Sequence, residues 1–244
     1  MIRAALLQRH HVLVEKPLTL EAETAIALCE LADQQQRQLI VDHTYLFHPA
    51  VQQAQQQMPQ LGSLRYGYAT RTHPEPVRPD VDVVWDLAIH DISILNFWLR
   101  DRPIRAQVIT QSWLSTRADL AWVQLEYPGG FTATLHLCWG NPDKQRRIGI
   151  VGDRGTLIFD ELQPPILSWL PMKGEAVPLS IDTTEPLWQV CDHFLTCIQH
   201  NQASKLSSGW VGAELVQILT AIAASLSQGG AWVVIPYSTR AIEN

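Results

Sequence analysis

Residues 11–41 read HVLVEKPLTLEAETAIALCELADQQQRQLIV, and this stretch decides the first part of the fold. The short apolar runs His11–Val14 and Leu39–Val41 are both typical of strands buried in a parallel sheet. Between them the sequence predicts a helix over Leu20–Gln36, with Thr19 as its N-cap. A strand, a helix and a second strand joined by short connections form a βαβ unit, so we expect a parallel sheet here.

Beyond about residue 60 the pattern changes to a run of strands that is closed by helices. The stretch 64–71 alternates apolar and polar residues, as an edge or half-exposed strand does. Apart from the βαβ unit, the sequence predicts helices at 2–9, 49–58, 83–99, 187–200 and 211–226. It predicts strands at 64–71, 106–115, 166–170, 176–179 and 232–235. Two hairpins are expected, one that pairs 120–127 with 131–139 and one that pairs 147–151 with 156–159. The predicted fold class is therefore α/β plus α+β, in which a parallel sheet precedes an open, mostly antiparallel sheet with helices on one face.

The composition is that of an ordinary globular protein with an acidic surface. The chain has 244 residues, of which 46% are hydrophobic, and its 18 basic and 24 acidic residues give a net charge of −6. Such a surface repels phosphate backbones and anionic membranes, so we expect no nucleic-acid partner and no membrane partner. No uninterrupted run of about 18 apolar residues occurs, so we expect no membrane-spanning helix and a cytoplasmic protein.

The cysteines lie in apolar stretches without C-x-x-C spacing, which favours buried thiols over a zinc site or a redox dithiol. They are Cys29, Cys138, Cys191 and Cys197. The glycine spacing also argues against a glycine-rich loop that binds nucleotide phosphates. Gly149, Gly152 and Gly155 are spaced three apart within a predicted hairpin, so they do not form a dinucleotide-binding fingerprint, and no P-loop sequence is present.

Lys16 is the first candidate site residue. It lies between Glu15 and Pro17 at the carboxyl end of the first predicted strand. Ligands of open α/β sheets bind at the carboxyl ends of the strands, and a partly desolvated lysine there can act as an acid or a base. The alternative is a solvated lysine in a turn.

Asp86 and His90 are the second candidate, because residues four apart share one face of a helix. A carboxylate beside an imidazole would raise its basicity, which suits an acid/base pair; two metal ligands or a surface hydrogen bond are the alternatives. The neighbouring Asp91 faces another way and is expected to be structural. Arg71 and Arg78 flank a proline-rich loop and could grip a phosphate or carboxylate, although solvated charges are the commoner outcome.

The sequence Glu15-Lys16-Pro17 resembles the E-K-P motif of the Gfo/Idh/MocA oxidoreductases, the family of glucose–fructose oxidoreductase and inositol dehydrogenase. The stretch from Asp86 to Asp91 is similar to the D-x-x-x-H-D motif of the same family. The motifs follow in the family's order, and the resemblance runs from Met1 to about Tyr237. The stretch from Leu46-Phe47-His48-Pro49 through Arg71, Arg78 and Trp85 is similar to a branch that acts on nucleotide-linked sugars.

The resemblance implies an oxidation or reduction of a sugar-type secondary alcohol with NAD or NADP and without a metal. Glu15, Lys16 and Pro17 would contact the cofactor, and Lys16 would also face the reacting hydroxyl. His90 would be the general acid/base, and Asp86 would orient the substrate, which Arg71 and Arg78 would bind. The resemblance also implies that residues 1–44 are a remnant of a Rossmann domain. Residues 45–244 would form a substrate and oligomerisation domain, whose open sheet face makes a homo-oligomer.

The chain departs from the family at its start. It begins in the helix before the E-K-P strand, so the family's glycine-rich fingerprint has no counterpart here. We therefore expect a truncated protein with impaired cofactor binding. Two alternatives stay open: a non-catalytic binding or assembly protein, and a metal enzyme that uses Asp86, His90 and another histidine.

Overall fold

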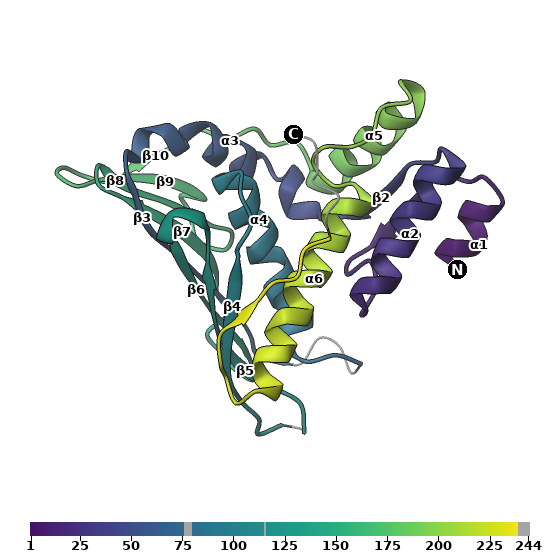
Figure 1. Cartoon of the computed structure of the whole chain (residues 1–244). Helices are drawn as coiled ribbons and strands as arrows, with labels where there is room; N and C mark the ends of the chain where they lie inside the picture. Colours follow the sequence, from purple (N-terminus) through teal and green to yellow (C-terminus); the bar gives the residue numbers. More distant parts are fainter. Residues whose placement is uncertain (76–79, 115, 239–244) are drawn as a thin grey trace.

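A computed structural model describes residues 1–75, 80–114 and 116–238. The chain forms a small two-stranded sheet with its helices and a large nine-stranded sheet with its helices, which lie on opposite sides of the molecule in Figure 1. The fold class predicted from the sequence is confirmed.

The small sheet has the predicted βαβ order. Its elements are α1 (Ile2–Leu7), β1 (Val12–Glu15), α2 (Ala22–Gln35) and β2 (Leu39–Asp42). The two strands are parallel, and Glu15 pairs with Asp42 at their carboxyl ends. The predicted N-cap is wrong by two residues, because Glu21 takes that position and Thr19 uses its hydroxyl to donate to the Glu21 carbonyl at 2.6 Å.

The large sheet has the strand order β10-β9-β8-β7-β3-β6-β5-β4-β11. Its strands are β3 (Leu64–His73), β4 (Arg105–Gln111), β5 (Leu120–Glu126), β6 (Thr132–Trp139), β7 (Arg146–Gly152), β8 (Gly155–Asp160), β9 (Leu167–Pro171), β10 (Val177–Pro178) and β11 (Val233–Val234). Both predicted hairpins form, as β5–β6 and β7–β8. The expectation of an edge or half-exposed strand at 64–71 is confirmed in its second form: β3 is central, parallel to β6 and antiparallel to β7, and one of its faces is exposed.

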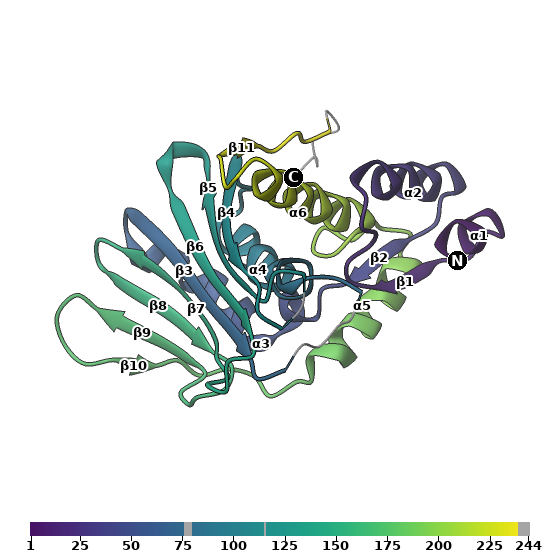
Figure 2. The ribbon, with the colours of Figure 1, turned by 90° about the horizontal axis from the view of Figure 1, so that it is seen from below.

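Helices cover only one face of the large sheet. The remaining helical elements are η1 (Thr44–Phe47), α3 (Pro49–Gln57), η2 (Met58–Leu61), η3 (Val84–Ala88), α4 (Ile89–Leu99), η4 (Pro128–Gly130), α5 (Pro186–Gln199) and α6 (Gly209–Ser227). Figure 2 shows α4 and α6 against one side of the sheet, and the other side carries no helix among the described residues. The core lies under these helices, where Val108, Val123 and Leu135 form one buried row across three strands.

The helix α6 joins the two sheets. A Cβ atom added at Gly212 would lie 2.6 Å from Val41 Cγ2, so the glycine allows α6 to approach β2 closely. By length and composition α6 is apolar enough to cross a membrane, which the sequence analysis did not expect, but 61% of its most apolar window is buried inside the protein. This burial is typical of a core helix.

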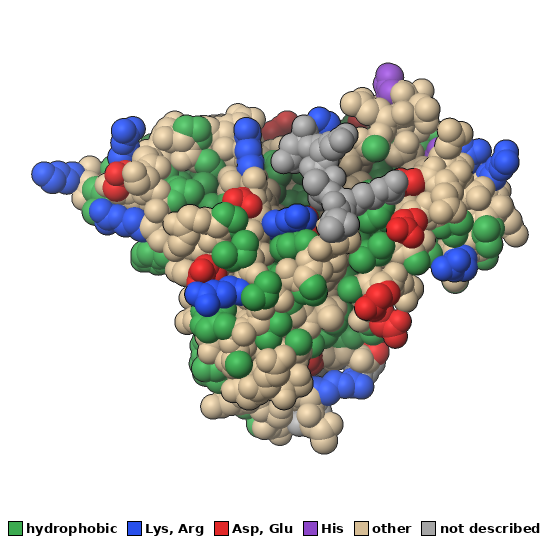
Figure 3. Space-filling view, viewed as in Figure 1, with side chains coloured by type: hydrophobic (Ala, Val, Ile, Leu, Met, Phe, Trp, Pro, Cys, Tyr) green, Lys and Arg blue, Asp and Glu red, His purple; other side chains and the backbone are tan. Residues whose placement is uncertain are grey.

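The surface agrees in part with the sequence-based predictions. Cys29, Cys138 and Cys197 are buried, whereas Cys191 is exposed on α5, so the expectation of a buried thiol is wrong at that position. On the face drawn in Figure 3, Lys and Arg side chains lie dispersed among uncharged and acidic groups and form no continuous basic patch.

Candidate active site

The segment that carries Asp86 begins with a π-helical turn rather than the α-helix predicted from residue 83. Asp82 fixes this turn, because its Oδ1 atom accepts hydrogen bonds from the backbone N–H groups of Val84 and Trp85, each at 3.0 Å. Single π-turns are wider than α-turns and often occur at functional sites. The wider turn changes how Asp86 lies relative to His90, so the two do not simply stack along one α-helical face.

Lys16 and Asp86 lie in direct contact although 70 residues separate them in the sequence. The Lys16 Nζ atom donates to the Asp86 carbonyl at 2.8 Å and lies 3.3 Å from Asp86 Oδ1. The lysine side chain is 15% exposed and the aspartate 6% exposed, so this ion pair is largely removed from water. The other carboxylate oxygen, Oδ2, is buried and has no hydrogen-bond partner among the described residues.

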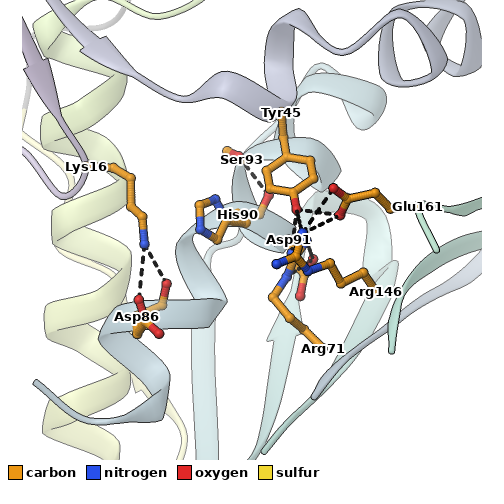
Figure 4. Close-up of polar contacts among 9 residues, drawn as sticks. All are labelled: Lys16, Tyr45, Arg71, Asp86, His90, Asp91, Ser93, Arg146 and Glu161. Carbon is orange, nitrogen blue, oxygen red and sulfur yellow. Dashed lines mark hydrogen bonds and ion pairs between the residues drawn. The ribbon is translucent and has the colours of Figure 1, made fainter. Parts of the chain in front are cut away.

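His90 lies between the Lys16–Asp86 pair and a second polar cluster (Figure 4). Its ring contacts the Tyr45 ring edge-on, with the centroids 5.0 Å apart. Burial and the positive charges of Lys16 and Arg71 hold the pKa of His90 well below its usual value. Asp86 is expected to raise the basicity of His90, but burial and the nearby cations lower it, so the imidazole is neutral.

Arg71 is buried against Asp91 at the base of this second cluster. Its Nε and Nη2 atoms donate to Asp91 Oδ1 at 3.1 and 2.7 Å, and its Nη1 atom donates to the Tyr45 hydroxyl at 3.0 Å. The structural role expected for Asp91 matches this position. The substrate-binding role expected for Arg71 does not, because its guanidinium is committed to an internal carboxylate and a phenol, and Arg78 lies outside the described residues.

Three members of this cluster were missed by the sequence analysis. The Tyr45 hydroxyl donates to Glu161 Oε2 at 2.6 Å, and Arg146 lies 3.1 Å from the Glu161 carboxylate. Tyr45 and Glu161 are 116 residues apart in the sequence, so no local sequence pattern links them. The cluster places Tyr45 firmly against His90 and so fixes one side of that ring.

His43 was also missed, because it forms no metal-ligand spacing with other histidines. It directly follows β2, as Lys16 directly follows β1, so the parallel pairing brings both residues to the same sheet end. The side chain is 1% exposed, and neither ring nitrogen has a hydrogen-bond partner in the described part of the chain. Burial and the nearby Lys16 charge lower the pKa of His43 to about 3.

The residues at this sheet end suit the reactive end of a dinucleotide better than its phosphates. Lys16 and His43 offer polar groups there, but the connection from β1 to α2 holds no glycine. The N-terminus of α6 does carry a glycine, Gly209, but the side chain of Leu39 fills the space beside it. A Cβ atom added at Gly209 would lie 2.8 Å from Leu39. No group of three His, Cys, Asp or Glu side chains arranged to hold a metal ion occurs among the residues that the structure describes.

Two family models match this chain. The model of the oxidoreductase family with an NAD-binding Rossmann fold matches residues 1–43, and the GFO/IDH/MocA C-terminal domain model matches residues 54–158. The chain belongs to the Gfo/Idh/MocA family. The resemblance seen in the two sequence motifs is thereby confirmed.

Related proteins include sugar dehydrogenases. The UDP-N-acetylglucosamine 3-dehydrogenase of Acidithiobacillus ferrooxidans is 32% identical over 126 residues, which are 51% of this chain and 40% of that protein. A solved structure of a UDP-N-acetylglucosamine 3-dehydrogenase from the same organism aligns with a TM-score of 0.82 and 25% identity, over 92% of this chain and 75% of that one.

Two more solved structures share the fold at lower identity. An oxidoreductase from Pseudomonas syringae has a TM-score of 0.86 at 21% identity, over 96% of this chain and 75% of that one. An inositol dehydrogenase homolog from Azotobacter vinelandii, complexed with NADH and myo-inositol, has a TM-score of 0.83 at 21% identity, over 96% and 74% of the two chains.

The buried His43 predicts a pH-dependent stability. Its pKa is about 3 in the folded chain against 6.5 for an ordinary histidine, so between these values the unfolded chain binds a proton that the folded chain does not. Stability therefore falls as the pH drops below 6.5. From pH 7 to pH 5 this one group lowers the free energy of unfolding by about 2 kcal/mol.

Urea unfolding of the wild type and of His43→Asn at both pH values measures this effect. The variant should lose about 2 kcal/mol less than the wild type between pH 7 and pH 5, while His200→Asn, at an exposed histidine after α5, should behave like the wild type. An identical pH dependence of His43→Asn and the wild type would show that His43 is not buried neutral.

Proposed function

We propose that this chain belongs to an NAD(P)-dependent oxidoreductase that acts on a secondary alcohol of a sugar or nucleotide sugar. The contact between Lys16 and Asp86 beside a neutral His90 is the observation that carries this proposal. These groups lie at the carboxyl end of a parallel strand, where open α/β sheets bind ligands. Residues 1–44 would belong to the dinucleotide-binding part and 45–244 to the part that binds substrate and forms oligomers.

Oxidation of an alcohol needs one group that takes the hydroxyl proton while hydride leaves the carbon. The nicotinamide, when bound, supplies the hydride acceptor. His90 is neutral and partly exposed, so it can take the proton from the substrate hydroxyl. Lys16 would stabilise the developing negative charge on that oxygen, and Asp86 would hold both the lysine and a second substrate hydroxyl in place.

The relatives support the substrate class. The curated relative that matches at 32% identity acts on UDP-N-acetylglucosamine, and a structural neighbour binds myo-inositol. Both molecules carry several hydroxyl groups, and hydroxyl donors suit a site with buried acceptors such as Asp86 Oδ2. Glu15 and Pro17 flank Lys16 at the strand end and would contact the cofactor on the same side.

A non-catalytic binding or assembly role is the second candidate function. The observation that favours it is the lack of a glycine at the start of α2, where a dinucleotide phosphate would approach a helix N-terminus. The site residues would then bind a sugar without transferring a hydride.

The open face of the large sheet would form a homo-oligomer in either case. Ile109 and Trp122 lie side by side on it, with 58% and 40% of their surfaces exposed, and Trp122 stacks on His136 of the next strand. Tyr66 adds a third ring, 48% exposed, on the central strand. Exposed apolar residues gathered on one face mark protein interaction surfaces.

Activity of site variants tests the proposed chemistry. Lys16→Ala and His90→Ala should each lower kcat about 100-fold or more on a panel of nucleotide sugars with NAD⁺ or NADP⁺, because each removes a group that acts on the reacting hydroxyl. His200→Ala, at an exposed histidine, is the matched control and should keep the wild-type rate. Circular dichroism confirms that each variant is folded. Equal, nonzero rates in all forms would exclude the catalytic roles, and no rate in any form would favour the binding role.

Calorimetry with NADH tests the cofactor expectation. The 244-residue chain should bind NADH weakly, with a dissociation constant above the micromolar range, because the connection from β1 to α2 holds no glycine and Leu39 fills the space beside Gly209 at the start of α6. Micromolar binding to the purified chain would contradict this expectation. NADPH, measured in parallel, shows whether a 2′-phosphate changes the outcome.

Sedimentation velocity tests the sheet face. The wild-type chain should sediment as a dimer or a larger assembly of the 27.5 kDa protomer. Trp122→Arg should shift it toward the monomer, because a charge would then be buried in an apolar interface. Gln199→Arg, on the exposed side of α5, should leave the assembly unchanged. A monomeric wild type would contradict the proposal.

A further inference from the structure

His43 takes no part in the proposed hydride and proton transfer, yet it lies beside Lys16 at the end of the small sheet. Its backbone is fully engaged: its N–H donates to the Val41 carbonyl and its own carbonyl accepts from Leu46, each at 2.8 Å. The Ser207 hydroxyl also donates to the Val41 carbonyl, at 2.5 Å, and so ties this strand end to the start of α6. The ring position is therefore well defined by the chain around it.

The ring itself is unusual in this protein because it is buried without any polar partner. Five other histidines have a ring nitrogen within hydrogen-bond distance of a polar group. They are His11, His48, His73, His193 and His200. His43 is 1% exposed, and both of its ring nitrogens lack a partner among the described residues. A buried polar group left in this way costs about 1–3 kcal/mol, so an apolar side chain would serve folding better.

The charges around the ring decide what kind of group it can bind. Lys16 lies close enough to disfavour a second positive charge, and His90 faces the same cluster of cations. The carboxylate of Asp42 is turned to the Thr44 hydroxyl at 2.7 Å and does not neutralise His43. A neutral imidazole offers one N–H donor and one lone pair, which matches an uncharged hydroxyl and not an anion.

A second buried atom of the same site lacks a partner. Asp86 Oδ2 accepts no hydrogen bond from the described residues, and its carboxylate contacts Lys16, which lies beside His43 at the sheet end. Lys16 therefore contacts Asp86, which has one unpartnered acceptor, and lies at the same sheet end as His43, whose ring has an unpartnered donor and acceptor. A molecule with several hydroxyl groups can satisfy both at once.

We propose that His43 is a substrate-binding residue that hydrogen-bonds a hydroxyl group of a sugar-type ligand on the side of Lys16 that faces β2. This inference rests on the proposed function for the substrate class, but it does not need hydride transfer to occur. His43 would set which hydroxyl pattern the site accepts, while Lys16 and His90 act on the reacting hydroxyl.

The test measures ligand binding to the full 244-residue chain without any turnover. UDP-N-acetylglucosamine and myo-inositol are each added to the ¹⁵N-labelled protein, and the ring-nitrogen resonance of His43, assigned by its loss in His43→Phe, is followed. Binding of at least one probe should shift this resonance. His43→Phe should weaken that probe's affinity about 10- to 100-fold, and His43→Asn, which keeps a donor and an acceptor, should recover part of the loss.

Each outcome decides the matter. A His43 resonance that neither probe moves overturns the inference, as does equal affinity of His43→Phe and the wild type. A parallel titration with NADH distinguishes sugar binding from cofactor binding. If His43→Phe weakens the affinity for NADH alone, His43 belongs to the cofactor site and the proposal is overturned. If a sugar binds through His43 but is never oxidised, the proposed enzymatic function fails and the binding role of His43 stands.

Discussion

The contact of Lys16 with Asp86 is the interaction on which the rest of the site depends. Lys16 directly follows β1 of the small parallel sheet, and Asp86 lies in the π-turn before α4, which packs under the large sheet. The ammonium group holds the carbonyl and the carboxylate of the same residue, so the turn and the strand end are fixed together. Loss of either partner would leave a largely buried charge, a change that costs about 3–5 kcal/mol.

This contact also divides the charges of the site into two groups with His90 between them (Figure 4). On one side, Lys16 is neutralised by Asp86. On the other side, Arg71 is held by Asp91 at 2.7 Å, and Arg146 by Glu161. Each cation is thus balanced locally, yet their combined potential keeps the His90 imidazole neutral. The neutral imidazole keeps a lone pair that can accept a hydrogen bond from a hydroxyl group, while the same burial and positive charges disfavour its protonated form.

The sequence predicts the framework of this arrangement well. The βαβ unit and both hairpins follow from local periodicity and turn residues, since strand and helix patterns act over a few residues. The sequence singles out Lys16, Asp86 and His90 as candidates because strand-end position and helical spacing are local signals, and because two motifs resemble those of one family.

Features that arise from tertiary packing could not be predicted from the sequence. The Asp82 carboxylate accepts hydrogen bonds from the first residues of the π-turn, and no helix propensity reveals that turn. Burial of Arg71 against Asp91 follows from β3 being central, which alternation alone does not show. The partner of Tyr45, Glu161, comes from a hairpin 116 residues later. Such pairs become visible only when the sheet order is known.

The two histidines of the site have similar electrostatic surroundings but differ in their exposure to solvent. Burial and positive neighbours lower the pKa of both His43 and His90. His90 keeps some solvent exposure, so a proton that it accepts from a ligand can pass on to water. His43 is closed off from solvent and lacks any partner that could relay a proton among the described residues. In the proposed function, proton transfer would therefore belong to His90, and the ring of His43 would suit a fixed hydrogen bond that does not change its charge.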